Sequence, residues 1–362
     1  MRIYYLLFCS LLAFSNNAQK ITETTTIIAH PNPALAVQKA NNNLDAIAFN
    51  NQYYLAFRTA PSHFASKKTR LIILKTNNLK DYTIDTTLCI GNDIREPRFA
   101  LKGDSLFLYY FEGGSKKLKF EPKKIWALVK TPSSAWTAPI DQQLDGYVPW
   151  RVRNINGTFY LSAYYGVNLY NKGHHSDLRL FTSDDGLQWK PFTDSAQCNL
   201  DFAEEGEFID DSKGELWGTI RFEGFGGALF HAEKNNWAKW VFYRTDYKYD
   251  SALLFNEGDD TYLIARRNID GKANRFKSRN RNLIRYSFTR KCTSLYKINK
   301  ENKRIDLVLD FPSTGDNAYA GIVQIGVKEY AVFNYSSNPK HPKNWIRGQL
   351  GKTNIYMHRL KF

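Results

Sequence analysis

Arginine, glutamate and tyrosine residues stand at the ends of short apolar segments along this chain, and their types suggest the binding of an anionic ligand and proton transfer. Arg58, Arg221 and Arg266 each end such a segment. A guanidinium presents a planar fork that suits a carboxylate, so three of them around one pocket would hold an anionic sugar. A tyrosine beside a glutamate can act as a nucleophile, because the carboxylate takes the proton of a phenol whose free pKa is about 10.

The segments that carry these residues repeat along the chain. A short aromatic segment recurs at 52–58, 105–111, 158–165, 215–221, 261–266 and 329–335. A second apolar segment follows each of them, at 69–76, 123–130, 176–183, 227–234, 283–290 and 353–360. Two series with one period indicate six copies of one antiparallel unit, and an aromatic content of 15% favours strands.

The repeat predicts an all-β fold, a six-bladed β-propeller. Four-stranded units of about 40–50 residues repeated radially are typical of this architecture. The sixth unit lacks its last strand because the chain stops at Phe362, whereas a spare strand precedes the first unit. We therefore expect residues 21–29 to pair beside 353–360 and to close the ring, within one domain of residues 19–362.

In such a ring, the first strands start and the second strands end at the same mouth of the central channel. The loops that follow the second strands lie there too, so side chains from all six units meet. The candidate site residues collected in this way are Arg58, His63, Arg95, Arg98, Tyr165, Glu205, Glu207, Arg221, Arg266 and Tyr319. No Cys or His pair has the spacing of metal ligands, so we expect neither a metal nor another cofactor.

One turn signature stands between the third and fourth strands of the third unit. Residues 182–189 read Thr-Ser-Asp-Asp-Gly-Leu-Gln-Trp. They fit the Asp-box pattern, in which Ser or Thr is followed by Asp two positions later, Gly two positions after that, and Trp three positions further on. The pattern makes Asp184 the residue that accepts hydrogen bonds from the turn, while Gly186 takes a positive φ and Trp189 packs under the hairpin.

With these features the chain resembles the sialidase superfamily, whose members are six-bladed propellers bearing Asp-boxes. The segment 205–221 is similar to the sialidase stretch in which a Glu opens one strand and a clamp Arg ends the next. The segment Ala318-Tyr-Ala-Gly321 resembles the stretch that carries the nucleophilic tyrosine. The resemblance implies that Tyr319 is the nucleophile, Glu205 its base partner and Arg221 part of a carboxylate clamp.

The chain also departs from the sialidase pattern. The Arg-Ile-Pro opening has no counterpart, and the slot of the acid/base aspartate after the first hairpin holds Ser62-His63. His63 is therefore the candidate that protonates the leaving group, because a free imidazole has a pKa near 6.5. We expect an exo-α-sialidase-like glycosidase. The alternatives are another propeller hydrolase or lyase that uses His63 or paired acids, and a glycan-binding propeller without catalysis.

The start of the chain and its charge bear on location and partners. Residues 1–18 have an early Arg, a short apolar run and a small residue at the end, which is typical of a cleaved signal peptide. We therefore expect a secreted or periplasmic monomer without a membrane span. The net charge of +15 suits an acidic glycan. Nucleic acid is a poorer candidate, because the chain is predicted to be exported and carries no nucleic-acid-binding module.

Overall fold

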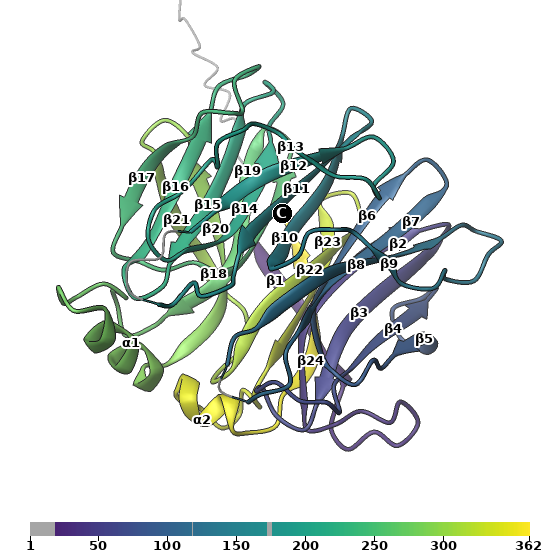
Figure 1. Ribbon diagram of the computed structural model, residues 1–362. Coiled ribbons are helices and arrows are strands. Elements are labelled where there is room, and N and C mark those ends of the chain that lie inside the picture. Colours follow the sequence, from purple (N-terminus) through teal and green to yellow (C-terminus); the bar gives the residue numbers. More distant parts are fainter. Residues whose placement is uncertain (1–18, 118, 172–175) are drawn as a thin grey trace, which may run out of the picture.

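The computed structural model describes residues 19–117, 119–171 and 176–362. Across these residues the strands form six four-stranded antiparallel sheets, which are the blades of a propeller (Figure 1). The predicted all-β, six-bladed fold is confirmed. The expected signal peptide, residues 1–18, lies outside the described residues. No helix in the described ranges is long and apolar enough to cross a bilayer.

The first three blades follow the order of the chain. In each blade the first strand contacts the first strands of the neighbouring blades, so these strands surround the axis. Blade 1 consists of β2 (Ala40–Phe49), β3 (Gln52–Ala60), β4 (Arg70–Thr76) and β5 (Thr83–Leu88). Blade 2 consists of β6 (Asp93–Lys102), β7 (Ser105–Gly113), β8 (Pro122–Lys130) and β9 (Ile140–Asp141). Blade 3 consists of β10 (Tyr147–Ile155), β11 (Thr158–Tyr165), β12 (Leu178–Ser183) and β13 (Lys190–Pro191).

The next two blades repeat this order, and the sixth borrows a strand from the start of the chain. Blade 4 consists of β14 (Ala203–Asp210), β15 (Leu216–Phe222), β16 (Gly226–Ala232) and β17 (Val241–Thr245). Blade 5 consists of β18 (Asp250–Glu257), β19 (Asp260–Asn268), β20 (Lys291–Asn299) and β21 (Arg304–Asp310). Blade 6 consists of β22 (Asn317–Gly326), β23 (Glu329–Ser336), β24 (Asn354–Lys361) and β1 (Lys20–Ile28).

The ring is closed as the sequence predicts. Strand β1 pairs antiparallel with β24, with Thr24 opposite His358, and it completes the last blade. The hydroxyl of Thr24 lies 2.9 Å from Nδ1 of His358. Nε2 of the same imidazole lies 3.0 Å from Oδ1 of Asn334 on β23. Closure therefore joins both ends of the chain by backbone and side-chain hydrogen bonds.

One predicted strand is wrong. Residues 283–290 were expected to form the third strand of the fifth unit, but helix α1 (Arg279–Phe288) occupies most of this segment and the strand β20 follows it. The side chain of Ser278 caps the helix by accepting from the N–H of Arg281. A second short helix, α2 (Trp345–Gln349), interrupts the connection between β23 and β24. The two helices lie together at one edge of the ring (Figure 1).

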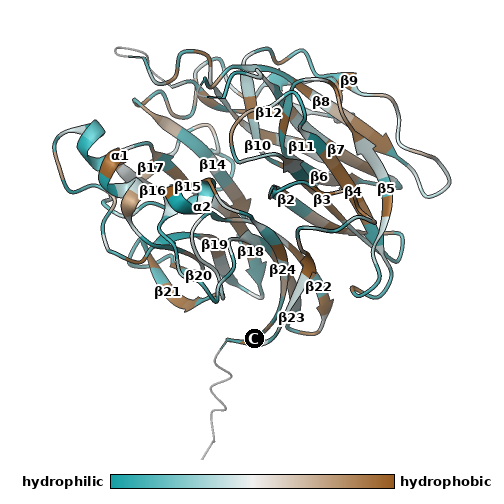
Figure 2. Ribbon diagram, turned by 90° about the horizontal axis from the view of Figure 1, so that it is seen from below, coloured by the Kyte–Doolittle hydropathy of each residue, from teal (hydrophilic) through white to brown (hydrophobic). Residues whose placement is uncertain are grey.

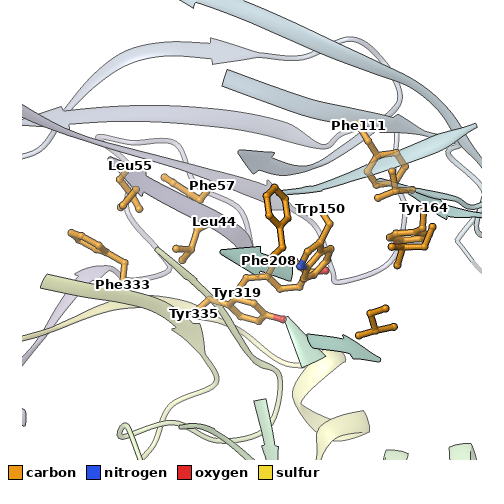
Figure 3. Packing of buried hydrophobic residues seen from close by; sticks show 14 of the residues in the cluster. Leu44, Leu55, Phe57, Phe111, Trp150, Tyr164, Phe208, Tyr319, Phe333 and Tyr335 are labelled. Atoms are coloured by element: carbon orange, nitrogen blue, oxygen red, sulfur yellow. The ribbon is translucent and has the colours of Figure 1, made fainter. Parts of the chain in front are cut away.

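The apolar core lies between blades and around the axis. Figure 2 shows hydrophobic residues concentrated on the strands, whereas the connecting loops are mostly hydrophilic. The largest buried cluster contains Trp150, Phe208 and Phe333 (Figure 3), each no more than 1% exposed. This packing fixes the first strands, and with them the side chains at the mouth of the channel.

The turn between β12 and β13 has the expected hydrogen-bond pattern, with a different aspartate. Oδ1 of Asp185 accepts from the N–H groups of Leu187 and Gln188, both at 2.8 Å, so Asp185 replaces the predicted Asp184. Gly186 has a φ of 77°, and Trp189 packs against the ring of Tyr109. The aspartate nearer the glycine can reach two N–H groups of the turn, which explains the shift by one position.

Candidate functional site

Each first strand carries a β-bulge near its start, and the bulges aim side chains at the axis. The pairing of the first and second strands shifts at this point in all six blades. A bulge bends its strand and redirects a side chain, and bulges are frequent beside active sites. In blade 3 the bulge residue is Trp150. In the other five blades it has a left-handed backbone, with φ between 45° and 57°, and these residues are Asn43, Glu96, Glu205, Ser251 and Tyr319.

All five left-handed residues line one cavity of about 480 Å³ at the mouth of the channel. Left-handed φ costs an L-residue about 1–2 kcal/mol, and such strain is typical of functional sites. The helices cover part of the mouth, with Arg279 and Leu283 from α1 and Trp345 and Gln349 from α2 in the wall. The repeat therefore supplies one cavity-lining side chain from the bulge of each blade except blade 3, and the helices enclose them.

The hydroxyl of Tyr319 donates a 3.0 Å hydrogen bond to Oε1 of Glu96. The partner expected from the sequence was Glu205. The two glutamates occupy the same bulge position in blades 2 and 4, and the packing of the ring brings Glu96 to the phenol. Oε2 of Glu96 has no hydrogen-bond partner among the described residues, so it can accept a proton or a ligand hydroxyl.

Burial sets the ionisation of this pair. Desolvation raises the pKa of Glu96 to about 7, and the charge of Glu205 adds to the shift while Arg98 opposes it. Desolvation also raises the pKa of Tyr319 well above 10, and the charges of Glu96 and Glu205 act in the same direction. Near neutral pH, Glu96 is thus poised to take a proton from a phenol that would not ionise alone.

Arg221 stands at the centre of an acidic cluster that lines the cavity. Its guanidinium lies 2.7 Å from Oε2 of Glu204, 2.6 Å from Oε1 of Glu205 and 3.2 Å from Oε2 of Glu223. Asp250 lies 3.7 Å away. Arg221 is therefore engaged by protein carboxylates, and it does not present the open fork that a carboxylate clamp needs.

His63 and Arg266 belong to a second network, which Asp250 links to the acidic cluster because it lies 3.5 Å from Arg266. Nδ1 of His63 lies 2.7 Å from Oδ2 of Asp316. The hydroxyl of Tyr335 donates to the other oxygen of Asp316 at 3.0 Å, and Nη2 of Arg266 donates to that hydroxyl at 3.2 Å. Burial opposes ionisation of Asp316, but His63 and Arg266 outweigh it and hold its pKa below the usual range. An ionised Asp316 orients the imidazole, as a carboxylate beside a catalytic histidine does.

Six predicted site residues line the cavity, namely His63, Arg95, Glu205, Arg221, Arg266 and Tyr319. Arg58 does not. It is fully buried and donates to Oδ1 of Asp93 at 2.8 and 3.0 Å.

Arg58 also donates to the carbonyls of Ser62 and Phe64, and Arg95 donates to the carbonyl of His63 at 3.0 Å. These two arginines hold the loop that carries His63, and the expected three-arginine clamp is not assembled.

Three other predicted residues lie outside the cavity. Arg98 is buried behind Tyr319, with its guanidinium 5.5 Å from the centre of that ring and 4.8 Å from the ring of Trp150. Glu207 is fully buried in ion pairs with Arg151 and Arg153, each at 2.7 Å. Tyr165 packs its ring against Tyr147 on blade 3. Arg98 and Glu207 are buried and Tyr165 is half-buried, and their partners give all three structural or supporting positions outside the cavity.

Two residues of the site, Glu96 and Asp316, are not among the ten candidates selected from the sequence. Glu96 stands between the selected residues Arg95 and Arg98, and an alignment of the six first strands would have placed it level with Glu205 and Tyr319. Asp316 directly precedes β22. Its role depends on contact with a loop of blade 1, so no local signal reveals it. Among the described residues, no group of three or more His, Cys, Asp or Glu side chains could hold a metal ion.

Comparison with known proteins finds likeness in structure alone. No protein-family model matches the chain, and no curated protein matches it by sequence. A protein of unknown function from Dyadobacter fermentans superposes with a TM-score of 0.67 at 14% identity, over 96% of this chain and 100% of that one.

A Trypanosoma rangeli sialidase mutant with trans-sialidase activity gives a TM-score of 0.66 at 8% identity, over 93% of this chain and 58% of that one. The sialidase from the same organism in complex with sialic acid gives 0.62 at 10% identity, over 89% of this chain and 54% of that one. The chain thus spans little more than half of the sialidase chains. At these identities the likeness shows the fold, a six-bladed propeller of the sialidase type.

Proposed function

We propose that this protein is a glycoside hydrolase that removes a terminal acidic sugar, in the manner of an exo-α-sialidase. Tyr319 is the nucleophile, Glu96 the base that takes its proton, and His63 the acid that protonates the leaving group. The hydrogen bond from Tyr319 to Glu96, within one cavity that His63 also lines, is the observation that carries the proposal. A cavity of about 480 Å³ suits a monosaccharide with part of its neighbour.

The reaction proceeds in two steps. Oη of Tyr319 bonds to the anomeric carbon while its proton passes to Glu96. The glycosidic C–O bond breaks, and the leaving oxygen takes the proton of His63. A water molecule then attacks the anomeric carbon, His63 recovers a proton from it, and Glu96 returns its proton to the phenol as the Tyr319–sugar bond breaks. A tyrosine suits an anionic anomeric centre, which would repel a carboxylate nucleophile.

A cation is needed for the acidic group of the sugar, and Arg279 is the best candidate. Its guanidinium lies over the ring of Phe202 at 4.1 Å and over that of Tyr170 at 5.4 Å. Among the described residues it forms no ion pair, whereas Arg95, Arg221 and Arg266 all do. Arg279 therefore takes the part that the resemblance gave to Arg221. Export through the predicted signal peptide would bring the enzyme to extracellular or periplasmic glycans.

The test is hydrolysis of an aryl sialoside by the exported form, residues 19–362. We expect Glu96→Gln to lower kcat/KM by roughly 10²–10⁴-fold, the usual contribution of a positioned base. Tyr319→Phe should lower it at least as much. Tyr165→Phe is the matched control, because this tyrosine lies outside the cavity, and it should keep wild-type activity. Turnover that survives Tyr319→Phe would remove the nucleophile from the mechanism.

The pH dependence gives an independent check. The base must be ionised, so kcat/KM should rise as the pH increases through about 7, the pKa of Glu96. The Glu96→Gln variant should lose this rise. A wild-type profile without a rise near pH 7 would contradict the assignment of Glu96.

One observation favours a second function, a glycan-binding propeller without catalysis. Arg221 is enclosed by carboxylates and Arg58 lies outside the cavity, so the clamp expected for a sialidase is not assembled. Retained binding of sialyl-lactose, combined with no turnover of any sialoside, would decide for this function.

A further inference from the structure

A second cavity of about 350 Å³ adjoins the first. The two share part of their walls, formed by His63, Arg95, Phe120, Trp345 and Gln349. Side chains common to both walls make the two cavities neighbours, within reach of a ligand longer than one sugar unit. The second cavity lies toward the loop between β7 and β8 of blade 2, which supplies Lys117, Lys119 and Glu121.

His63 stands where the cavities meet, and this position fixes the direction of a bound glycan. A general acid must lie within hydrogen-bond reach of the oxygen that it protonates. If His63 is the acid, the bond that breaks crosses the boundary between the cavities. The first cavity, which holds Tyr319, then takes the terminal sugar, and the second takes the leaving group.

The wall of the second cavity combines aromatic faces with unpaired positive charge. Phe111 and Phe120 lie 6.2 Å apart between ring centres, and Phe120 is 36% exposed, so it can stack on a sugar. Asp93 is occupied by ion pairs with Arg58 and Arg95. Lys117 and Lys119 are exposed and, within the described ranges, form no ion pair. Glu121 is the remaining carboxylate in this wall, so the lysines outnumber it.

We propose that the second cavity is a subsite for a leaving-group sugar that carries an anionic substituent, a sulfate or a carboxylate. Lys117 and Lys119 bind the substituent, and Phe120 stacks on the ring. The substrate is then a glycan in which the terminal acidic sugar is attached to a second, anionic unit. This inference rests on the proposed function for the orientation of the glycan, whereas the binding of the anionic sugar can be measured without turnover.

The test is calorimetric titration with three disaccharides: N-acetyllactosamine, its 6-sulfate, and digalacturonate. We expect the wild-type protein to bind at least one anionic disaccharide roughly 10-fold more tightly than the neutral one, the effect of a charged hydrogen bond. Lys117→Ala combined with Lys119→Ala should abolish this preference. Lys116→Ala is the matched control, since Lys116 lies in the same loop, is exposed and does not line the cavity. It should retain the preference.

The outcomes separate this inference from the proposed function. A preference for sulfate or for carboxylate identifies the substituent. Equal affinity of the wild type for all three disaccharides, or equal losses in the Lys116 and the double variant, overturns the subsite. Lysine-dependent binding without hydrolysis of an aryl sialoside leaves the subsite standing and removes the hydrolase. Hydrolysis of the aryl sialoside without lysine-dependent binding removes the subsite and leaves the hydrolase standing.

Discussion

At the scale of single residues, the candidate site is built at the expense of stability. Glu96 is 6% exposed, and its carboxyl has the phenol of Tyr319 as its hydrogen-bond partner among the described residues. A buried carboxylate without a close cation is disfavoured. Arg98, whose charge opposes the rise in the pKa of Glu96, lies behind the ring of Tyr319 and leaves Nε and Nη2 without hydrogen-bond partners in the described part of the chain. A carboxyl held in this way is ready to exchange a proton near neutral pH.

Replacing Glu96 by Gln should therefore stabilise the protein, by an amount that grows as the pH rises from about 4.5 and is largest above about 7. The folded-state pKa of about 7 lies above the unfolded value of 4.5. The folded state thus binds more protons between these values, and stability is lost as the pH rises from 4.5 through 7. A shift of this size corresponds to about 3 kcal/mol. Urea unfolding at pH 4.5 and pH 8.5 should show little difference between wild type and Glu96→Gln at the lower pH, and a more stable variant at the higher pH.

The exposed Glu301→Gln change is the control for this measurement, and it should leave the free energy of unfolding unchanged at both pH values. A Glu96→Gln variant that is less stable than the wild type at pH 8.5 would mean that the carboxylate is stabilised in the fold, which contradicts its raised pKa.

Which residues gather at the mouth could be predicted from the sequence, because the repeat places strand starts and ends on one face. His63, Glu205, Arg221 and Tyr319 all line the cavity for this reason. Their partners could not be predicted. Whether Tyr319 meets Glu96 or Glu205 depends on how far each blade is rotated about the axis, and this rotation is set by packing between blades.

At the scale of elements, the bulge at the start of each first strand is the device that builds the site. A regular strand points alternate side chains to opposite faces, so without the bulge the first strands would aim fewer polar groups along the axis. The sequence does not mark these bulges, because the residues in the left-handed positions are not glycines. Helix α1 could not be predicted for a related reason. The regular spacing of the repeat puts the third strand of this unit at 283–290, but in blade 5 an insertion that contains α1 separates β19 from β20.

The left-handed position in blade 5 offers a test of this strain. Ser251 has a φ of 57°, is 2% exposed and leaves its hydroxyl without a partner among the described residues. Its N–H donates to Oε2 of Glu205 at 2.7 Å, and a glycine would keep that bond. The left-handed cost of about 1–2 kcal/mol exceeds the entropy cost of glycine, about 0.5–1 kcal/mol. Ser251→Gly should therefore raise the free energy of unfolding by up to about 1 kcal/mol in a denaturant titration.

The contrasting variant is Ala265→Gly in the regular part of β19, where glycine brings only its entropy cost and a lost buried methyl group. It should lower the free energy of unfolding. If Ser251→Gly were destabilising to a similar degree, the bulge would carry no backbone strain.

At the scale of the whole molecule, the ring depends on a strand contributed by the start of the chain. Closure leaves only short, protected sheet edges in a propeller. Without β1, the edge of β24 would present its backbone groups to solvent beside Ile355 and Met357, which are now buried. Burial also lowers the pKa of His358 to about 4. The imidazole is thus neutral at pH 7 and can bridge Thr24 and Asn334 without burying a charge.

Removal of residues 19–30 should open the ring. Strand β1 pairs with β24 from Lys20 to Ile28, and at about 1 kcal/mol for each hydrogen bond lost, the free energy of unfolding should fall by several kcal/mol. The control is the chain that begins at residue 19, so that only the predicted signal peptide is absent. Thermal unfolding of the shortened chain should begin several degrees lower, and a synthetic peptide of residues 19–30 should restore part of the loss by adding back the strand. Equal melting temperatures for the two chains would show that blade 6 holds with three strands, and closure by β1 would then contribute nothing to the stability of the propeller.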